Sequence, residues 1–365
     1  MECNPVIARR ILDWYVRHQR DLPWRHTRDP YFIWVSEVML QQTRVDTVIP
    51  YYHRFLSKFP TLESLARAPL QEVLKVWENL GYYSRARHLH AAAERVMSRM
   101  GGLMPKSEGE LLELPGVGPY TAAAILSIAH GRKIAAVDGN VRRVICRIFA
   151  VMEPIDRATV RKRIHEIANA LIPRGEASRF NQGIMEFGAT LCTPRSPACG
   201  QCSLQDLCLA YQKGCQTEIP VRNHRKVIPH VQVTAGIIRD SRGRLLVVRR
   251  PIQGFLGGLW KFPGGEKHAG DTLEHSLKEE IKRELGIDVQ VSDVLTSIKH
   301  AYSHFRITLF ALACILKKGR PKAPTCSDWQ WIAPNRLGEI PFSKAERKII
   351  ASLNNFSAVK ISNTF

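Results

Sequence analysis

The chain lacks any hydrophobic run that approaches the length of a membrane-spanning helix, although it is 365 residues long. Its first residues, MECNPVIARRILDWY, also lack the charged, apolar and cleavage regions of a secretory signal. These two absences exclude the ordinary routes into or across a membrane, so we expect a cytoplasmic protein with no membrane partner. Hydrophobic residues at 45% and charged residues at 24% are typical of soluble proteins, and the length allows two or three domains.

Acidic residues are scarce compared with basic ones. The chain has 33 Asp and Glu against 53 Lys and Arg, which gives a net charge of +20. Residues 1–215 carry 29 basic and 20 acidic side chains, and residues 216–365 carry 24 and 13, so the excess is not a basic tail. A positive charge on both halves of the chain favours binding of a nucleic acid from two sides. The alternative is that the charge serves only solubility. A DNA partner would place the protein at the nucleoid.

The pattern of apolar residues changes once along the chain. Helical spacing dominates up to residue 215, which predicts one all-α unit of two lobes. Residues 216–230 carry two prolines and several basic residues and are the best linker candidate. Strand-like runs then alternate with a helix expected near residues 272–285, so the second half is predicted to be α/β. The last stretch, residues 356–365, is expected to be a disordered tail.

A glycine-rich turn stands at the centre of the first unit. It reads Pro115-Gly116-Val117-Gly118-Pro119 and precedes an Ala- and Leu-rich helical stretch. Glycines leave the backbone amides at a helix start uncovered, and such amides bind phosphate. About twenty residues on comes a lone acid, Asp138. We interpret the stretch as a hairpin that grips a DNA backbone; the alternative is a plain turn before a buried helix, with Asp138 as its N-cap.

Four of the nine cysteines lie in one short segment, with the spacing Cys192-x6-Cys199-x2-Cys202-x5-Cys208. Disulfides are unexpected in a protein without a secretory signal, and thiolates at this density select zinc or an iron–sulfur cluster. Zinc sites usually use two close pairs, whereas only one Cys-x2-Cys pair is present here. The spacing therefore favours one 4Fe-4S cluster, with zinc as the alternative.

These motifs together resemble one family. LPGVG at Leu114–Gly118, the Asp138 segment and the four cysteines resemble the helix-hairpin-helix DNA glycosylases of the endonuclease III superfamily. Within it, SEVMLQQT at Ser36–Thr43 and DGNV at Asp138–Val141 resemble the adenine DNA glycosylases of the MutY family. Tyr120 stands where endonuclease III enzymes carry the lysine of their lyase activity. The resemblance covers nearly the whole chain.

The resemblance implies a multidomain fold. Residues 1–215 would form the all-α helix-hairpin-helix catalytic domain, with a six-helix lobe at about 22–130 and an iron–sulfur lobe from about 1–21 and 131–215. Residues 231–355 would form an α/β Nudix (MutT-like) domain beyond the linker. The four cysteines would hold the 4Fe-4S cluster.

The resemblance also implies a chemistry. Cleaving adenine from deoxyribose needs an acid to protonate the base and an anion to stabilise a cationic sugar, as in glycoside hydrolysis. Glu37, in an apolar helical context, is expected to be the acid, because desolvation would keep it protonated. Asp138 is expected to be the anion, and Tyr120 and Asn140 to orient these groups or the water. Without a lysine at position 120 the enzyme should be monofunctional.

The target base must be flipped out of the duplex, which requires residues that fill the hole. The resemblance assigns this and other DNA contacts to residues far apart in the sequence: Arg25, Gln41, Gln42, Thr43, Tyr82, Gly116, Val117 and Gly118. For each side chain among them the alternative is a residue packed in the core or in a turn.

The second domain contains an altered Nudix box, from Gly264 to Ile287. Glu279 stands in place of the box's Arg, and Arg283 in place of a metal-binding Glu, so we expect no pyrophosphohydrolase activity. Tyr302-Ser303-His304 resembles the Phe-Ser-His loop of the family, which implies that Ser303 and His304 contact 8-oxoguanine.

The function that follows is base excision repair: a monomer that hydrolyses adenine mispaired with 8-oxoguanine or guanine in double-stranded DNA. The nearest alternative is a bifunctional endonuclease III-like enzyme acting on oxidised pyrimidines. A non-catalytic DNA-binding scaffold and a nucleotide hydrolase are less favoured, because Glu37 and Asp138 are intact and Arg283 interrupts the Nudix box.

Overall fold

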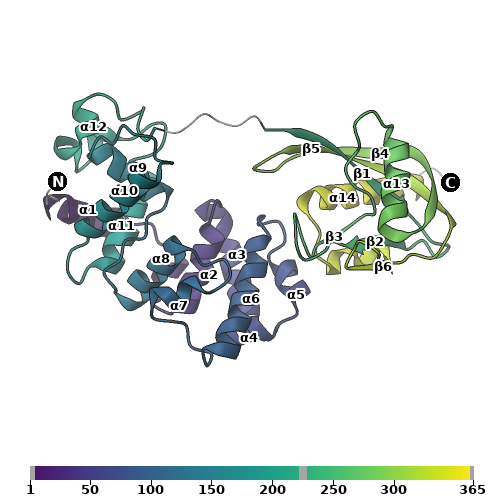
Figure 1. The fold of residues 1–365 in the computed structure, drawn as a ribbon, viewed down its shortest axis with the longest axis horizontal. Coiled ribbons are helices and arrows are strands. Elements are labelled where there is room, and N and C mark those ends of the chain that lie inside the picture. The colour runs from purple at the N-terminus through teal and green to yellow at the C-terminus, as the bar shows by residue number, and fades with distance from the viewer. Residues whose placement is uncertain (1–4, 222–227, 362–365) are drawn as a thin grey trace. The chain divides into compact units, whose positions relative to one another are not determined.

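The structure is a computed structural model that describes residues 5–221 and 228–361. The chain forms two compact units (Figure 1). The first comprises residues 1–67 and 88–225, and the second residues 68–87 and 226–365. The segment Ala68–Arg87 thus groups with the C-terminal half, although the sequence pattern places it among the N-terminal helices. None of the helices in the described ranges has both the length and the apolar character needed to span a bilayer.

The first unit is helical, as its apolar spacing predicts. Its helices are α1 (Pro5–His18), α2 (Pro30–Leu40), α3 (Val45–Lys58), α4 (Leu62–Arg67), α6 (Ser84–Arg99, whose first turn belongs to the second unit), α7 (Glu108–Leu112), α8 (Pro119–His130), α9 (Gly139–Ile148), α10 (Ala158–Leu171), α11 (Ala177–Thr190) and α12 (Leu209–Gln212).

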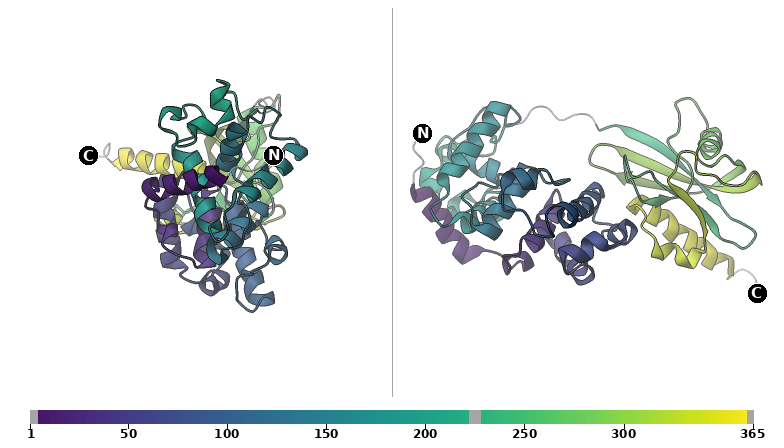
Figure 2. Two further views of the ribbon diagram at one scale, coloured as in Figure 1. Left: turned by 90° about the vertical axis from the view of Figure 1, so that its left-hand side faces the viewer. Right: turned by 60° about the horizontal axis from the view of Figure 1, so that its bottom comes forward.

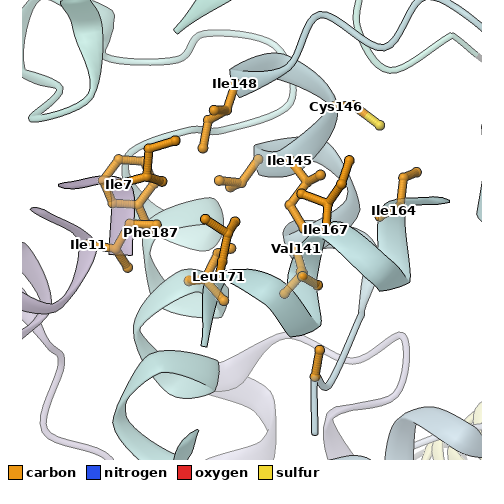
Figure 3. Packing of buried hydrophobic residues seen from close by; sticks show 14 of the residues in the cluster. Ile7, Ile11, Val141, Ile145, Cys146, Ile148, Ile164, Ile167, Leu171 and Phe187 are labelled. Carbon is orange, nitrogen blue, oxygen red and sulfur yellow. The ribbon is translucent and has the colours of Figure 1, made fainter. Parts of the chain in front are cut away.

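One apolar core holds α1 against helices that come much later in the chain (Figure 3). In α9, Val141, Val144, Ile145 and Ile148 fall at i, i+3, i+4 and i+7, so they share one buried face. Helix α1 and its partners complete the cluster with Ile7, Ile11, Ile164, Ile167, Leu171 and Phe187. Each such side chain stabilises the fold by roughly 1.5–3 kcal/mol when fully buried. This packing fixes α9 and α11 side by side.

The second unit is α/β, as predicted. Its elements are α5 (Leu70–Val76), β1 (His230–Ile238), β2 (Leu245–Arg249), β3 (Trp260–Lys261), α13 (Leu273–Leu285), β4 (Asp288–Ala301), β5 (Arg306–Lys318), β6 (Asp328–Ile332) and α14 (Lys344–Ile361).

Two three-stranded sheets form this unit. In one, β1 pairs parallel to β5 and β5 antiparallel to β4; in the other, β2 pairs antiparallel to β3 and β6. Neighbouring residues of β1 point to opposite faces: Ile237 packs in the core with α14, and Ile238 in the core with α13. Figure 2 shows the long strands beside the yellow helix α14.

The C-terminal stretch differs from its expectation. Helix α14 continues to Ile361, so the first part of the expected disordered tail is helical. No proline or glycine interrupts this sequence, which lets the helix extend past the domain core. Residues 362–365 lie outside the described residues, as do residues 222–227 of the expected linker.

Candidate active site

A cleft of about 650 Å³ opens in the first unit, between α2, α8, α9 and α11. It gathers most of the residues that the sequence singles out in this unit, including all four expected catalytic residues. Its lining includes Arg25, Glu37, Gln41, Gln42, Thr43, Gly116, Gly118, Tyr120, Asp138, Asn140 and Glu186.

Glu37 lies on α2 and is almost fully buried. Tyr120, the second residue of α8, donates its hydroxyl to Glu37 Oε2 at 2.6 Å. Burial raises the pKa of Glu37 to about 7; the Tyr120 hydrogen bond opposes this rise, and the charge of Asp138 adds to it. The Glu37 carboxyl group therefore holds its proton close to neutral pH.

Asp138 is the N-cap of α9. Its Oδ1 accepts from the Val141 backbone N–H at 2.7 Å, and its Oδ2 accepts from Asn140 Nδ2 at 2.9 Å. Burial raises the pKa of Asp138, and these donors oppose the rise. Because more hydrogen bonds stabilise the charged form at Asp138 than at Glu37, we expect the proton on Glu37 and the negative charge on Asp138.

Asp138 can therefore serve both as the N-cap of α9 and as the expected anion. Capping uses Oδ1, while Oδ2 is held by the neighbouring amide of Asn140. Tyr120 and Asn140, the two expected orienting residues, each bond to one of the two acids.

A third acid in the cleft, Glu186 on α11, is absent from the sequence-based set. Its side chain is 2% exposed and accepts from Arg20 Nε at 2.7 Å and from Arg25 NH2 at 2.9 Å. Burial opposes ionisation, but the hydrogen bonds from the two arginines hold the pKa of Glu186 at about 2. A charged residue within the apolar run Ile184-Met185-Glu186-Phe187 was the signal that could have identified it.

The Gln41–Thr43 turn follows α2 at the edge of the cleft. Gln41 Nε2 donates to Thr121 Oγ1 at 3.4 Å, and Thr43 Oγ1 donates to the Gln41 carbonyl at 3.4 Å. Gln42 has φ of 56°, a left-handed conformation that costs energy for a residue with a side chain. Strained backbone of this kind is concentrated at functional sites.

The glycine-rich turn leads into α8. Gly116 has φ of 75°, and a Cβ there would lie 2.6 Å from the Cβ of His88. Both the backbone conformation and the lack of space therefore require glycine. Gly118 is the N-cap of α8. Val117 differs from its expectation, because its side chain is buried and its backbone N–H donates to the Leu114 carbonyl at 3.1 Å. Its amide thus closes the turn instead of facing outward.

The four expected metal-ligating cysteines, Cys192, Cys199, Cys202 and Cys208, line one small cavity as free thiols. Arg147, almost fully buried, donates to Cys192 Sγ at 3.3 Å and to the Thr193 carbonyl at 2.7 Å. Among the described residues, no three His, Cys, Asp or Glu side chains lie close enough to hold a single metal ion. Four thiols around a shared cavity, beside a buried guanidinium that offsets negative charge, fit a thiolate-bound metal group.

Arg143 connects the cysteine loop to Asn140, the hydrogen-bond partner of Asp138. It donates NH2 to Asn140 Oδ1 at 2.8 Å and to the Gly188 carbonyl at 2.7 Å, and Nε to the Cys192 carbonyl at 2.8 Å. Asn140 in turn bonds to Asp138. The backbone of the first cysteine is therefore two side chains away from the expected anion.

A separate pocket of about 360 Å³ lies in the second unit and collects the other expected DNA contacts. Tyr82, Ser303 and His304 all line it, and the Tyr82 hydroxyl lies 2.5 Å from Ser303 Oγ. Tyr82 also has a left-handed φ of 47°. Tyr302, where the family has Phe, keeps aromatic contacts with Phe255 at 4.8 Å between ring centroids.

The altered Nudix box carries its own cations. Arg283 NH2 pairs with Glu280 at 2.5 Å, and the buried Lys261 pairs with Glu284 at 2.9 Å. These protein cations occupy the carboxylates that a working box offers to Mg²⁺. The pair between Arg283 and Glu280 agrees with the expectation that Arg283 opposes Mg²⁺ binding at the box. Lys261 is a second cation of this kind, and is absent from the sequence-based expectation.

Known proteins resemble this chain over nearly its whole length. It is 34% identical to the adenine DNA glycosylase of Rattus norvegicus, with 94% of this chain and 77% of that protein covered. It is 34% identical to the Homo sapiens enzyme, covering 93% and 72%, and 31% identical to one from Buchnera aphidicola, covering 86% and 87%. This chain belongs to the adenine DNA glycosylase family.

Family models match the parts of this adenine DNA glycosylase family member separately. Residues 35–170 match the HhH-GPD superfamily of base excision DNA repair proteins, residues 192–208 the iron–sulfur binding domain of endonuclease III, and residues 234–352 the NUDIX domain. The iron–sulfur match begins at Cys192 and ends at Cys208, so the cofactor is an iron–sulfur cluster.

Solved structures agree for the helical part. A thermostable thymine-DNA glycosylase is 37% identical, with a TM-score of 0.53 over 57% of this chain and 96% of that one. Endonuclease III in a non-covalent DNA complex is 25% identical, with a TM-score of 0.50 over 57% and 95%. The family member thus combines a helix-hairpin-helix glycosylase fold with a Nudix fold.

Proposed function

We propose that the protein hydrolyses the bond between adenine and deoxyribose in duplex DNA where the adenine faces 8-oxoguanine or guanine. The observation that carries the proposal is one cleft with two acids in opposite states: Glu37, with a pKa of about 7 and a 2.6 Å bond from Tyr120, and the hydrogen-bonded Asp138. Such a pair supplies both an acid and an anion.

Glu37 delivers its proton to N7 of the flipped adenine, and the electron pair of the bond between C1′ and N9 leaves with the base. Its raised pKa suits a general acid working near pH 7. Tyr120 holds the carboxyl group through Oε2, which leaves Oε1 for the base.

Asp138 stabilises the cationic sugar that remains. Water then attacks C1′ and gives a proton to the Glu37 carboxylate, which restores the acid and yields adenine and an abasic site. A well-placed charged group of this kind is worth roughly 3–4 kcal/mol in a dehydrated site. Asn140 and the Val141 amide fix the orientation of Asp138.

The family's bifunctional relatives use a lysine where this chain has Tyr120. Here the Tyr120 hydroxyl is committed to Glu37 and lies 3.3 Å from Met185 Sδ, so this position offers no amine for a Schiff base. The proposal is therefore a monofunctional glycosylase. Treatment with borohydride should trap no covalent complex with DNA.

Further side chains and backbone amides contact the DNA. Arg25 supports the adenine pocket, Gln41 or Gln42 fills the hole left by the base, and Gly116 and Gly118 offer the turn to a phosphate. The opposite base is contacted by Thr43, Tyr82, Ser303 and His304. Residues 1–215 act as the catalytic domain and 231–355 as the reader, joined by 216–230. Both sites lie on one chain, so the proposal requires only a monomer, acting on nucleoid DNA.

Cys192, Cys199, Cys202 and Cys208 would hold the iron–sulfur cluster, which would supply a rigid cross-link for this loop. The residues around it do the rest: Arg143 ties the loop to Asn140, and Arg147 ties it to the end of the helical unit at Ile219.

The test is adenine release from duplexes that contain A opposite 8-oxoguanine, A opposite G, or thymine glycol. We expect release from the first two duplexes and no reaction with the third. Asp138→Asn should lower the rate at least ~10²-fold while the protein still binds the mismatch. Asp13→Asn, an exposed change on α1, is the matched control and should leave the rate unaltered. Thymine glycol excision without adenine release would establish the alternative.

A further inference from the structure

Segment Ala68–Arg87 groups with the C-terminal half, and not with the helices that flank it in the sequence. It carries Tyr82, whose hydroxyl lies 2.5 Å from Ser303 Oγ. Tyr82 is 38% exposed and Ser303 is also exposed, so this contact is too accessible to hold the segment in place by itself. Something else must keep the two side chains together.

Glu78 attaches the segment. This carboxylate is 8% exposed and accepts hydrogen bonds from the three donors that follow. The Phe342 backbone N–H donates to its Oε1 at 2.8 Å, Arg347 Nε donates to the same oxygen at 2.6 Å, and Lys75 Nζ donates to Oε2 at 2.7 Å. Charged groups so buried are kept only with partners, and here two of the three come from residues 342–347.

Residues 342–347 span the entry to α14 and its first helical turn, and are called here the 342–347 turn. Tyr83, next to Tyr82, adds a second attachment by donating its hydroxyl to the Phe342 carbonyl at 3.3 Å. Arg347 is itself fixed, since its NH1 and NH2 donate to the carbonyls of Leu337 at 2.8 Å and Ile340 at 2.6 Å. The turn is therefore a rigid support for the segment.

The same turn also holds the loop that carries Ser303. Tyr302 packs against the apolar cluster that contains Phe342 and Ala345, and it lines the same pocket as Ser343. Ser343 is almost fully buried and lies within the 342–347 turn. The two sides of the pocket, the Tyr82 side and the Ser303 side, are thus both attached to one short turn.

We propose that Glu78, through its bonds to the 342–347 turn, is a positioning residue that sets Tyr82 beside Ser303 and thereby determines the preference for 8-oxoguanine over guanine opposite adenine. This inference rests on the proposed function. Glu78 is not among the residues that line the cleft around Glu37 and Asp138, whereas Tyr82 and Ser303 line the pocket of the second unit. We therefore expect its effect on recognition of the opposite base.

Glu78→Gln is the informative variant. Glutamine keeps a carbonyl oxygen for the Phe342 amide but removes the charge that binds Arg347, and Arg347 retains the Leu337 and Ile340 carbonyls. The measurement is the single-turnover rate of adenine release from A opposite 8-oxoguanine and from A opposite G. We expect the ratio of the two rates to fall about tenfold, with the A:G rate changed less than about twofold.

Two further variants make the test specific. Tyr83→Phe, which removes only a hydroxyl, should shift the ratio in the same direction by a smaller factor, and it serves if Glu78→Gln does not fold. Glu339→Gln is the control, because Glu339 is half-exposed in the same unit and pairs with Arg336 outside the turn. It should leave the ratio unchanged.

A merely structural role for Glu78 would lower both rates by the same factor, and that result, or an unchanged ratio, overturns the inference while the proposed function stands. A wild-type protein that releases no adenine from either duplex overturns the proposed function and this inference together.

Discussion

At the scale of single residues, the cleft shows how the same functional group takes different protonation states. Glu37 is buried with one hydroxyl donor, and its pKa rises to about 7. Glu186 is as deeply buried but meets two guanidinium groups, and its pKa falls to about 2. Burial alone would raise the pKa of both carboxyl groups. The charged neighbours of Glu186 reverse the direction of the shift.

Glu37→Gln should stabilise the protein at alkaline pH. The folded state binds the Glu37 proton more tightly than the unfolded chain does, so the contribution of this proton is fully present below pH 4.5 and is lost as pH rises to about 7. The cost of the ionised form is roughly 3 kcal/mol. Thermal melts of wild type and variant at pH 5 and pH 8 should show a higher melting temperature for the variant at pH 8 only. An equal difference in melting temperature at both values would contradict the assigned pKa.

Glu186→Gln should have the opposite pH dependence. The pKa of Glu186 is depressed, so its stabilisation is present above pH 4.5 and is lost as pH falls toward 2. Removing the charge leaves Arg20 and Arg25 without their partner and should cost about 3 kcal/mol near neutral pH. Urea unfolding at pH 7 and pH 3 measures the free energy of unfolding of both proteins. The difference in this free energy between variant and wild type should be smaller at pH 3 than at pH 7. A gap that widens there would count against the ion pairs.

At the scale of elements, the active site depends on how closely α9 and α11 approach. Gly188 of α11 stands against Asn140, where an added Cβ would lie 2.7 Å from the Asn140 Cβ and 3.1 Å from its carbonyl oxygen. The backbone carbonyl of Gly188 also accepts from Arg143. A glycine within a helix is otherwise unfavourable by about 1 kcal/mol, so its presence here reflects this contact.

Gly188→Ala should displace Asn140 and, with it, Asp138. We expect adenine release to slow at least ~10-fold, because small displacements of a catalytic group are costly. Gly109→Ala in α7 is the matched control, since nothing lies within 4 Å of its added Cβ. Single-turnover rates for the two variants make the comparison, and equal rates would show that α11 yields to the extra methyl group.

At the scale of the whole molecule, charge governs binding. The net charge of +20 is shared by both halves of the sequence, so DNA binding should depend steeply on salt. If six or more phosphates are contacted, affinity for an undamaged duplex should fall about 10³-fold between 50 and 200 mM salt. Fluorescence anisotropy across this range gives the slope. A flat dependence would mean that the charge serves solubility alone.

The sequence by itself determined the features that depend on local chemistry or on spacing. Helical periodicity predicted the first unit, period-two runs predicted the second, and the spacing of four cysteines predicted an iron–sulfur loop. Glu37, Asp138, Tyr120 and Asn140 could be selected because their motifs are short and contiguous. The charge state of the Nudix remnant followed from Arg283, which lies on the same helix as Glu280.

Only the tertiary structure decided what depends on residues far apart in the chain. Glu186 gains its role from arginines more than 160 positions away, and its sequence context signals only that it needs a partner. The Val117 backbone N–H donates to the Leu114 carbonyl within the turn, whereas the sequence motif predicts that it faces outward. Segment Ala68–Arg87 has an ordinary helical pattern, yet packs with the C-terminal half, because its polar groups at Gln71, Glu78 and Tyr83 find their partners there. Periodicity records which face of an element is buried, but not which distant element buries it.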